Sequence, residues 1–87
     1  MLKITRTDSP ERSRLHLEGR LTVADVPALD EACTEAQSAR RALVLDLAGL
    51  RFADRTGTVA LQRLRAAGAR LDNATAFLTE LLQEEGI

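Results

Sequence analysis

Aromatic residues are nearly absent from this 87-residue chain, which has no Trp, no Tyr and two Phe. Base-stacking platforms and aromatic cages need several exposed rings, so the composition argues against both kinds of site. The sequence also has a single cysteine, Cys33, which cannot form an intrachain disulfide. A reducing compartment fits this cysteine usage, and we therefore expect a cytoplasmic protein.

Long apolar runs and an excess of positive charge are missing as well. The mainly apolar stretch 42–48 is far shorter than the roughly 20 residues that a membrane-spanning helix needs. No basic start followed by an apolar run marks a secretory signal. The formal net charge is -1, whereas binding to a phosphate backbone needs clustered Lys and Arg. We expect neither direct membrane insertion nor nucleic-acid binding, and a protein is the favoured partner.

The first third of the chain has the pattern of a β-hairpin followed by a helix. Apolar residues alternate over 2–6 and again over 14–18, which is typical of half-buried strands, and residues 7–11 read as the turn between them. Gly19 is expected to end the second strand. Apolar positions three or four apart then predict a helix over 26–38, with Asp25 as its N-cap and Pro27 in its first turn.

The rest of the chain alternates between strand and helix patterns. Residues 42–48 are apolar on both faces, as in a central strand, and a second helix is predicted between Asp54 and Gly68. A short strand over 69–72 precedes a last helix, which is expected to end at Gly86, followed by Ile87. Four residues of that helix are expected to point inward: Phe77, Leu78, Leu81 and Leu82.

The predicted order is ββαβαβα. We therefore expect the α/β class, with a small mixed sheet of about four strands and three helices packed mainly on one face. Residues 1–87 show no internal repeat and no linker, so one domain is predicted.

Candidate catalytic and metal-binding residues are few. His16 has no second His or Cys at ligand spacing, and the alternation of its strand places it on the surface. Cys33 falls on the apolar stripe of the first helix, where a small buried side chain is expected. The sequence has no phosphate-binding loop, dinucleotide fingerprint or nucleophile elbow. We therefore expect no enzyme activity, no cofactor and no metal.

The junction 50–58, from the central strand into the second helix, is the most informative segment. Asp54 is expected to cap the helix by accepting hydrogen bonds from its free N–H groups. A helix N-terminus also favours an anion such as a phosphate, so a hydroxyl there can act as a switch.

Three stretches of the sequence together resemble a STAS domain, the family of bacterial anti-sigma-factor antagonists and of the cytoplasmic domains of sulphate transporters. They are Leu17-Glu18-Gly19-Arg20-Leu21, Leu43-Val44-Leu45-Asp46-Leu47 and Asp54-Arg55-Thr56-Gly57, and the final residues 81–87 are similar to the family's last helix. The resemblance implies a mixed sheet with helices mainly on one side. It also implies a function in protein docking and signalling regulation.

The resemblance further implies which residues contact a partner. In partner-switching antagonists an anti-sigma kinase phosphorylates a Ser or Thr directly after the motif's Asp, and here that position is Arg55. A second departure is Thr22, where the family often has an acidic residue. The expected partner-binding residues are Thr22, Asp54, Arg55, Thr56 and Thr58. Thr56 is the remaining candidate for phosphorylation.

Three functions remain open on the sequence alone. The first is an antagonist or scaffold module in a partner-switching pathway, which binds an anti-sigma kinase-type protein. The second is the STAS subunit of a lipid-asymmetry ABC transporter, which docks on the ATPase subunit without being phosphorylated. The third is a helix-turn-helix regulator built from the last two helices, although Glu80, Glu84 and Glu85 would then face the DNA backbone.

Overall fold

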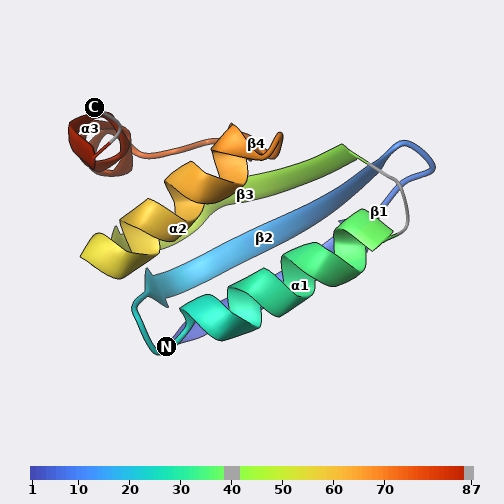
Figure 1. Cartoon of the computed structure of the whole chain (residues 1–87), viewed down its shortest axis with the longest axis horizontal. Helices are drawn as coiled ribbons and strands as arrows, with labels where there is room; N and C mark the ends of the chain where they lie inside the picture. Colours follow the sequence, from blue (N-terminus) through green and yellow to red (C-terminus); the bar gives the residue numbers. More distant parts are fainter. Residues whose placement is uncertain (39–41, 86–87) are drawn as a thin grey trace.

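The computed structural model describes residues 1–38 and 42–85. Four strands form one mixed sheet in the spatial order β1-β2-β3-β4, and the element order is ββαβαβα (Figure 1). The predicted fold class is thereby confirmed. The elements are β1 (Leu2–Asp8), β2 (Arg12–Leu21), α1 (Val26–Ser38), β3 (Ala42–Ala53), α2 (Arg55–Ala66), β4 (Arg70–Asp72) and α3 (Ala76–Glu85).

β1 and β2 form the expected antiparallel hairpin, but β2 does not stop at Gly19. Gly19 adopts a φ of 96°, a left-handed value that glycine tolerates, and the register to β3 shifts directly after it. A Cβ at Gly19 would lie 2.5 Å from the Met1 carbonyl oxygen. The glycine therefore accommodates an irregularity inside the strand, and β2 continues to Leu21.

β2 and β3 pair in parallel over most of their length, and α1 connects them. β3 is longer than the apolar stretch 42–48 suggested: its pairing with β2 continues past Ala48 to Ala53, with two register shifts on the way. β4 adds only a short parallel edge next to residues 44–46 of β3.

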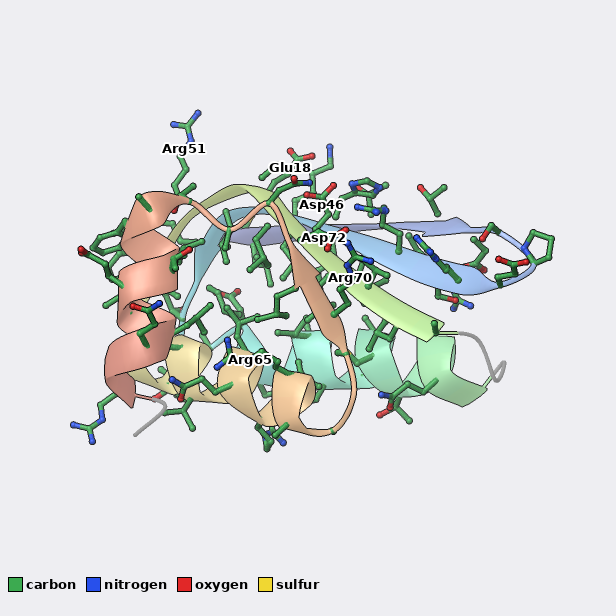
Figure 2. The ribbon with its side chains drawn as sticks, turned by 90° about the horizontal axis from the view of Figure 1, so that it is seen from above. Glu18, Asp46, Arg51, Arg65, Arg70 and Asp72 are labelled. Atoms are coloured by element: carbon green, nitrogen blue, oxygen red, sulfur yellow. The ribbon has the colours of Figure 1, made fainter. Side chains whose placement is uncertain are left out.

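α1 and α2 cover one face of the sheet, and α3 stands at one end of the molecule against α2 (Figures 1 and 2). Leucines from β2, β3 and the helices meet between these layers; Leu17, Leu29, Leu45 and Leu61 are fully buried. The opposite face has no helix over it in the described part of the chain, and we call it the open face (Figure 2).

The last helix differs from the prediction at one residue. Leu78 and Leu82 are buried and Leu81 is partly buried, but the Phe77 side chain is 50% exposed. Phe77 and Leu81 are four residues apart and lie at the margin of the buried side that Leu78 and Leu82 form, so both are less buried than those two. The expected stop at Gly86 and Ile87 lies outside the described residues.

Candidate functional site

The candidate site forms where β2 and β3 end side by side. These strands are parallel neighbours, so their carboxyl ends meet at one edge of the sheet, with Leu21 opposite Ala53. The Asp54 N–H donates a hydrogen bond to the Leu21 carbonyl oxygen at 3.0 Å. This bond extends the strand pairing to the residue before α2, so Asp54 alone connects β3 to α2.

Asp54 holds the two chain segments at this edge together. Its backbone is extended (φ -76°, ψ -178°), and its Oδ1 accepts the Gly57 N–H at 2.7 Å, which is the N-cap expected from the sequence. Its Oδ2 accepts the Val23 N–H at 3.0 Å. One carboxylate therefore caps α2 and fixes the loop between β2 and α1 against it.

Thr22 and Asp25 fix the other side of this loop. The Asp25 carboxylate accepts the Thr22 N–H at 3.1 Å and the Thr22 hydroxyl at 2.9 Å, and the Asp25 N–H donates to the Thr22 carbonyl oxygen. The hydrogen bonds from Thr22 lower the pKa of Asp25 because they stabilise its charged form. The carboxylate that was expected to cap α1 thus accepts hydrogen bonds from Thr22 and closes the turn before the helix.

Gly57 allows α2 to start very close to the end of β2. It is buried, and a Cβ at this position would lie 2.5 Å from the Leu21 carbonyl oxygen and 2.9 Å from Leu21 Cγ. Any larger residue would push the first turn of α2 away from the sheet. The glycine of the Asp54-Arg55-Thr56-Gly57 motif is therefore explained by packing.

The structure brings four of the five expected partner-binding residues to this edge. Arg55 and Thr56 are exposed, and Thr22 and Asp54 are partly exposed. Thr58 is different: it is 2% exposed because it lies on the inner side of α2 beside Gly57. The expectation that Thr58 belongs to the docking surface is wrong for the protein as folded.

Two exposed aliphatic residues beside the motif were missed from the sequence. Val23 is 62% exposed in the loop that Asp54 holds, and Val59 is 45% exposed one turn after Arg55 on α2. Val59 lies outside the apolar stripe of α2, which is the signal that could have identified it. We call Thr22, Val23, Asp54, Arg55, Thr56 and Val59 the α2-start surface.

The other two candidate residues, His16 and Cys33, make contacts with the rest of the fold. His16 lies on the open face, where its Nδ1 is 3.2 Å from Asp46 Oδ2. Cys33 is buried in the core, and burial raises the pKa of its thiol to about 11. Within residues 1–38 and 42–85, no three His, Cys, Asp or Glu residues gather where they could hold a metal ion.

The sequence matches a family model described as "Mlab, STAS domain" over residues 4–87. The chain belongs to the STAS domain family. This confirms the resemblance seen in the sequence. The helix-turn-helix interpretation is wrong, because β4 lies between α2 and α3. No curated protein matches the sequence.

Solved structures share the STAS fold at low sequence identity. The anti-sigma factor antagonist SpoIIAA in its unphosphorylated form is 22% identical, with a TM-score of 0.69, and the match covers 95% of this chain and 82% of SpoIIAA. An antisigma-factor antagonist STAS domain from Rhodobacter sphaeroides is 21% identical, with a TM-score of 0.61, covering 86% of this chain and 92% of that one.

A third similar structure is a much longer protein. Mglu is 24% identical, with a TM-score of 0.68, and the match covers 83% of this chain. The STAS chain spans only 20% of the length of Mglu. Identities this low establish a shared fold and leave the partner to be determined.

The helices of this STAS domain give one further observation. In the described ranges, 1–38 and 42–85, none of them combines the length and the apolar character that crossing a bilayer requires.

Proposed function

We propose that this STAS domain is a non-catalytic, cytoplasmic module that docks a protein partner constitutively through the α2-start surface. The observation that carries the proposal is the double hydrogen bond of Asp54, which fixes the Val23 loop against the first turn of α2. Two exposed valines and the Arg55 cation are thereby held on one preformed surface. Preformed surfaces lose little conformational freedom on binding, which favours affinity.

Arg55 is the reason for proposing constitutive docking. The residue directly after Asp54 has no hydroxyl, so it cannot accept a phosphate, and it has a fixed positive charge where phosphorylation would add about two negative charges. An acidic patch on the partner is the natural complement of this cation.

The proposal covers two kinds of partner. An anti-sigma kinase-type protein agrees with the fold shared with the two antagonist structures. The ATPase subunit of a lipid-asymmetry transporter agrees with Arg55, because docking there needs no phosphate switch. If a phosphorylation switch operates in either pathway, Thr56, which is exposed in the same helical turn, is the favoured acceptor.

The affinity of each purified candidate partner for charge-reversed variants tests the docking surface. Arg55→Glu should weaken binding, because it reverses the charge in the interface. An acid in the first turn of α2 is favourable to the helix by about 0.3–1 kcal/mol, so the variant should remain folded. Arg65→Glu, at the opposite end of the same helix, is the control and should bind like the wild type. Full affinity of Arg55→Glu would place the interface elsewhere.

Thr56→Val separates constitutive from switched docking. The substitution removes the hydroxyl and keeps the side-chain size. In the constitutive case the partner binds the variant as it binds the wild type, with or without ATP. Release of the wild type by a partner kinase and ATP, with no release of Thr56→Val, would overturn constitutive docking and identify Thr56 as the acceptor.

A further inference from the structure

Charge is distributed unequally between the two sides of the sheet. Outward-pointing positions of the four strands place six basic and three acidic residues on the open face: Lys3, Arg12, Arg14, Arg20, Arg51 and Arg70, with Glu18, Asp46 and Asp72. The open face therefore has a formal charge of +3, whereas the whole chain has -1. The helix side and the loops account for the remaining -4.

Four charged residues of the open face, Arg14, Asp46, Arg70 and Asp72, neutralise one another. Arg14 contacts Asp46 at 3.3 Å and Asp72 at 3.1 Å, and Arg70 contacts Asp72 at 2.6 Å. Asn73 also donates to Asp46 at 3.0 Å. This network occupies both aspartates of the open face. Arg12 lies outside it at the start of β2, and three more cations lie outside it towards the other end of the sheet.

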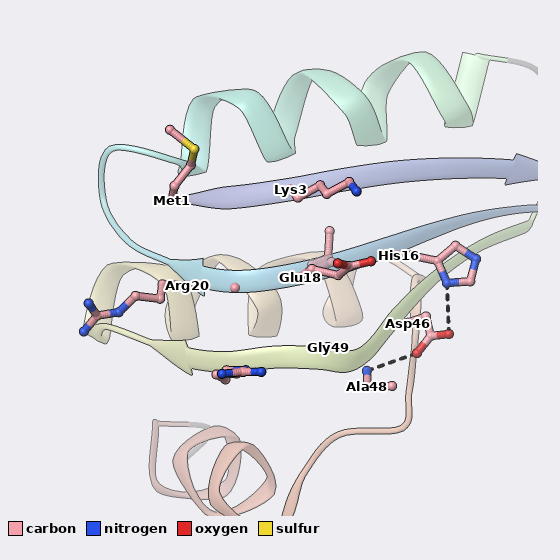
Figure 3. Close-up of a pocket in the computed structure, with 11 residues that line it drawn as sticks. Met1, Lys3, His16, Glu18, Arg20, Asp46, Ala48 and Gly49 are labelled. Atoms are coloured by element: carbon pink, nitrogen blue, oxygen red, sulfur yellow. Dashed lines mark hydrogen bonds and ion pairs between the residues drawn. The ribbon is translucent and has the colours of Figure 1, made fainter.

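At that end three cations surround a shallow hollow. Lys3 of β1, Arg20 of β2 and Arg51 of β3 line it, and Figures 2 and 3 show the side of the sheet on which it opens. Arg20 packs over the Phe52 ring at 5.1 Å from its centroid. Within the described part of the chain, neither Lys3 nor Arg51 forms an ion pair. Two acids, Glu18 and Asp46, also line the hollow, and Asp46 is already engaged by Arg14, His16 and Asn73.

Small residues make the hollow. Gly19, Ala48 and Gly49 line it, and its volume is about 800 Å³. A Cβ on Gly49 would lie 2.8 Å from Glu18 Cγ, so the glycine leaves room for the Glu18 side chain to pack against β3. The floor therefore sits below the surrounding cations, which leaves room for side chains of a bound molecule.

We propose that this hollow on the open face binds an acidic segment of a protein partner, with its carboxylates directed to Lys3, Arg20 and Arg51. The uncompensated positive charge selects an anionic occupant, and a concave site between strands fits a peptide better than a flat bilayer. Membrane-surface sites typically have several exposed aromatic and aliphatic residues next to the cations, whereas here the Phe52 ring lies under Arg20 and Met1 is the exposed hydrophobic residue of the lining. This second docking site lies on the side of the sheet opposite α2.

The probe is a fluorescent Glu- and Ser-containing peptide of about ten residues, long enough when extended to cross the sheet. Its binding is measured by anisotropy at low ionic strength, where exposed charges are least screened. Lys3→Gln, Arg20→Gln and Arg51→Gln should each weaken binding roughly two- to five-fold, as expected for exposed ion pairs. Glu18→Gln should strengthen binding, because it removes the repelling acid.

Arg65→Gln is the matched control, since it removes one exposed cation from the helix side (Figure 2). Its affinity for the peptide should equal that of the wild type, and so should that of Arg55→Glu, which separates this proposal from the α2-start surface. Equal weakening by Arg65→Gln, or no strengthening by Glu18→Gln, would overturn the site. Displacement of the peptide by millimolar inorganic phosphate, or preferential binding to vesicles containing phosphatidylserine, would overturn the acidic-peptide assignment.

Discussion

Gly57 lies so close to Leu21 that a Cβ at this position would come within 2.5 Å of the Leu21 carbonyl oxygen. The contact is with backbone, which cannot rotate away, so the two elements must separate if the glycine is replaced. Because glycine has no Cβ, the end of β2 and the start of α2 can remain in contact. Asp54 can bridge to Val23 only while this contact holds.

Gly57→Ala should therefore destabilise the domain, although alanine is the better helix former. Overpacking costs about 1–3 kcal/mol, and the gain in helix propensity offsets at most about 1 kcal/mol. A net loss of about 1–2 kcal/mol corresponds to a melting temperature lower by roughly 4–16 °C. Val59→Ala gains propensity at an exposed position of the same helix and should melt no lower than the wild type. An unchanged melting temperature for Gly57→Ala would contradict the packing argument.

Leu45→Ala tests the centre of the core. Leu45 is fully buried in β3 and pairs with Leu15 on the inner face of the sheet. Truncation should cost roughly 2–5 kcal/mol, because it removes buried carbon atoms and leaves a cavity. The total stability of so small a domain is about 5 kcal/mol, so the urea midpoint should fall by roughly 40% or more, and a loss at the upper end of the range would leave the variant partly unfolded without denaturant. A midpoint close to that of the wild type would show that the core lies elsewhere.

The pH dependence of stability should depend on Asp46. Hydrogen bonds from Asn73 and from the Ala48 N–H, with the nearby His16 and Arg14, lower the pKa of Asp46 below its ordinary value of 3.8. A lowered pKa in the folded state means that the stabilisation is complete above this ordinary value and is lost as the pH falls through the lower folded-state pKa. Acid should therefore destabilise the domain.

Urea unfolding at pH 7 and at about pH 3 measures this loss. Asp46→Asn should lose less stability between the two values than the wild type does, because its side chain does not titrate. Glu18→Gln removes an exposed carboxylate from the same face and should keep most of the wild-type pH dependence. If Asp46→Asn and the wild type lost equal stability, Asp46 would not be a source of the acid sensitivity.

Cys33 should be unreactive in the folded protein. Its side chain is buried, and burial raises the thiol pKa to about 11, so both access and thiolate are lacking at neutral pH. Alkylation by iodoacetamide should be at least about 100-fold slower in buffer than in denaturing urea, because it requires an opening of the core. A Cys33→Ala, Thr34→Cys variant moves the thiol to the exposed neighbouring position and should react rapidly. Fast alkylation of wild-type Cys33 would mean that α1 opens readily.

Local patterns were sufficient to predict much of this fold. Residues 26–38 show a clear helical period, and α1 has those bounds; Asp54 was expected as an N-cap and accepts the Gly57 N–H. The predictions that failed depend on contacts between distant segments. Gly19 follows a strand pattern, so it was expected to end the strand. Its backbone is instead needed inside β2, where the Met1 carbonyl approaches.

Part of the candidate site could also be predicted from local sequence patterns. The Asp54-Arg55-Thr56-Gly57 motif lies in one short segment, so its residues were identified together. The inward position of Thr58 depends on which side of α2 meets the sheet, and the exposure of Val23 depends on a hydrogen bond to Asp54, 31 residues away. The cations of the open face come from three strands, and only the sheet order brings them to one hollow.

The parallel pairing of β2 with β3 also determines how this chain can fold. Paired residues such as Leu15 and Leu45 are 30 positions apart, and all of α1 lies between the two strands. The hairpin partners Thr7 and Arg14, in contrast, are neighbours in the chain and can meet early. Closing the long loop costs chain entropy before the core contacts repay it. Folding should therefore be limited by the search that brings β3 to β2, and it should be slower than the folding of a helical bundle of the same length.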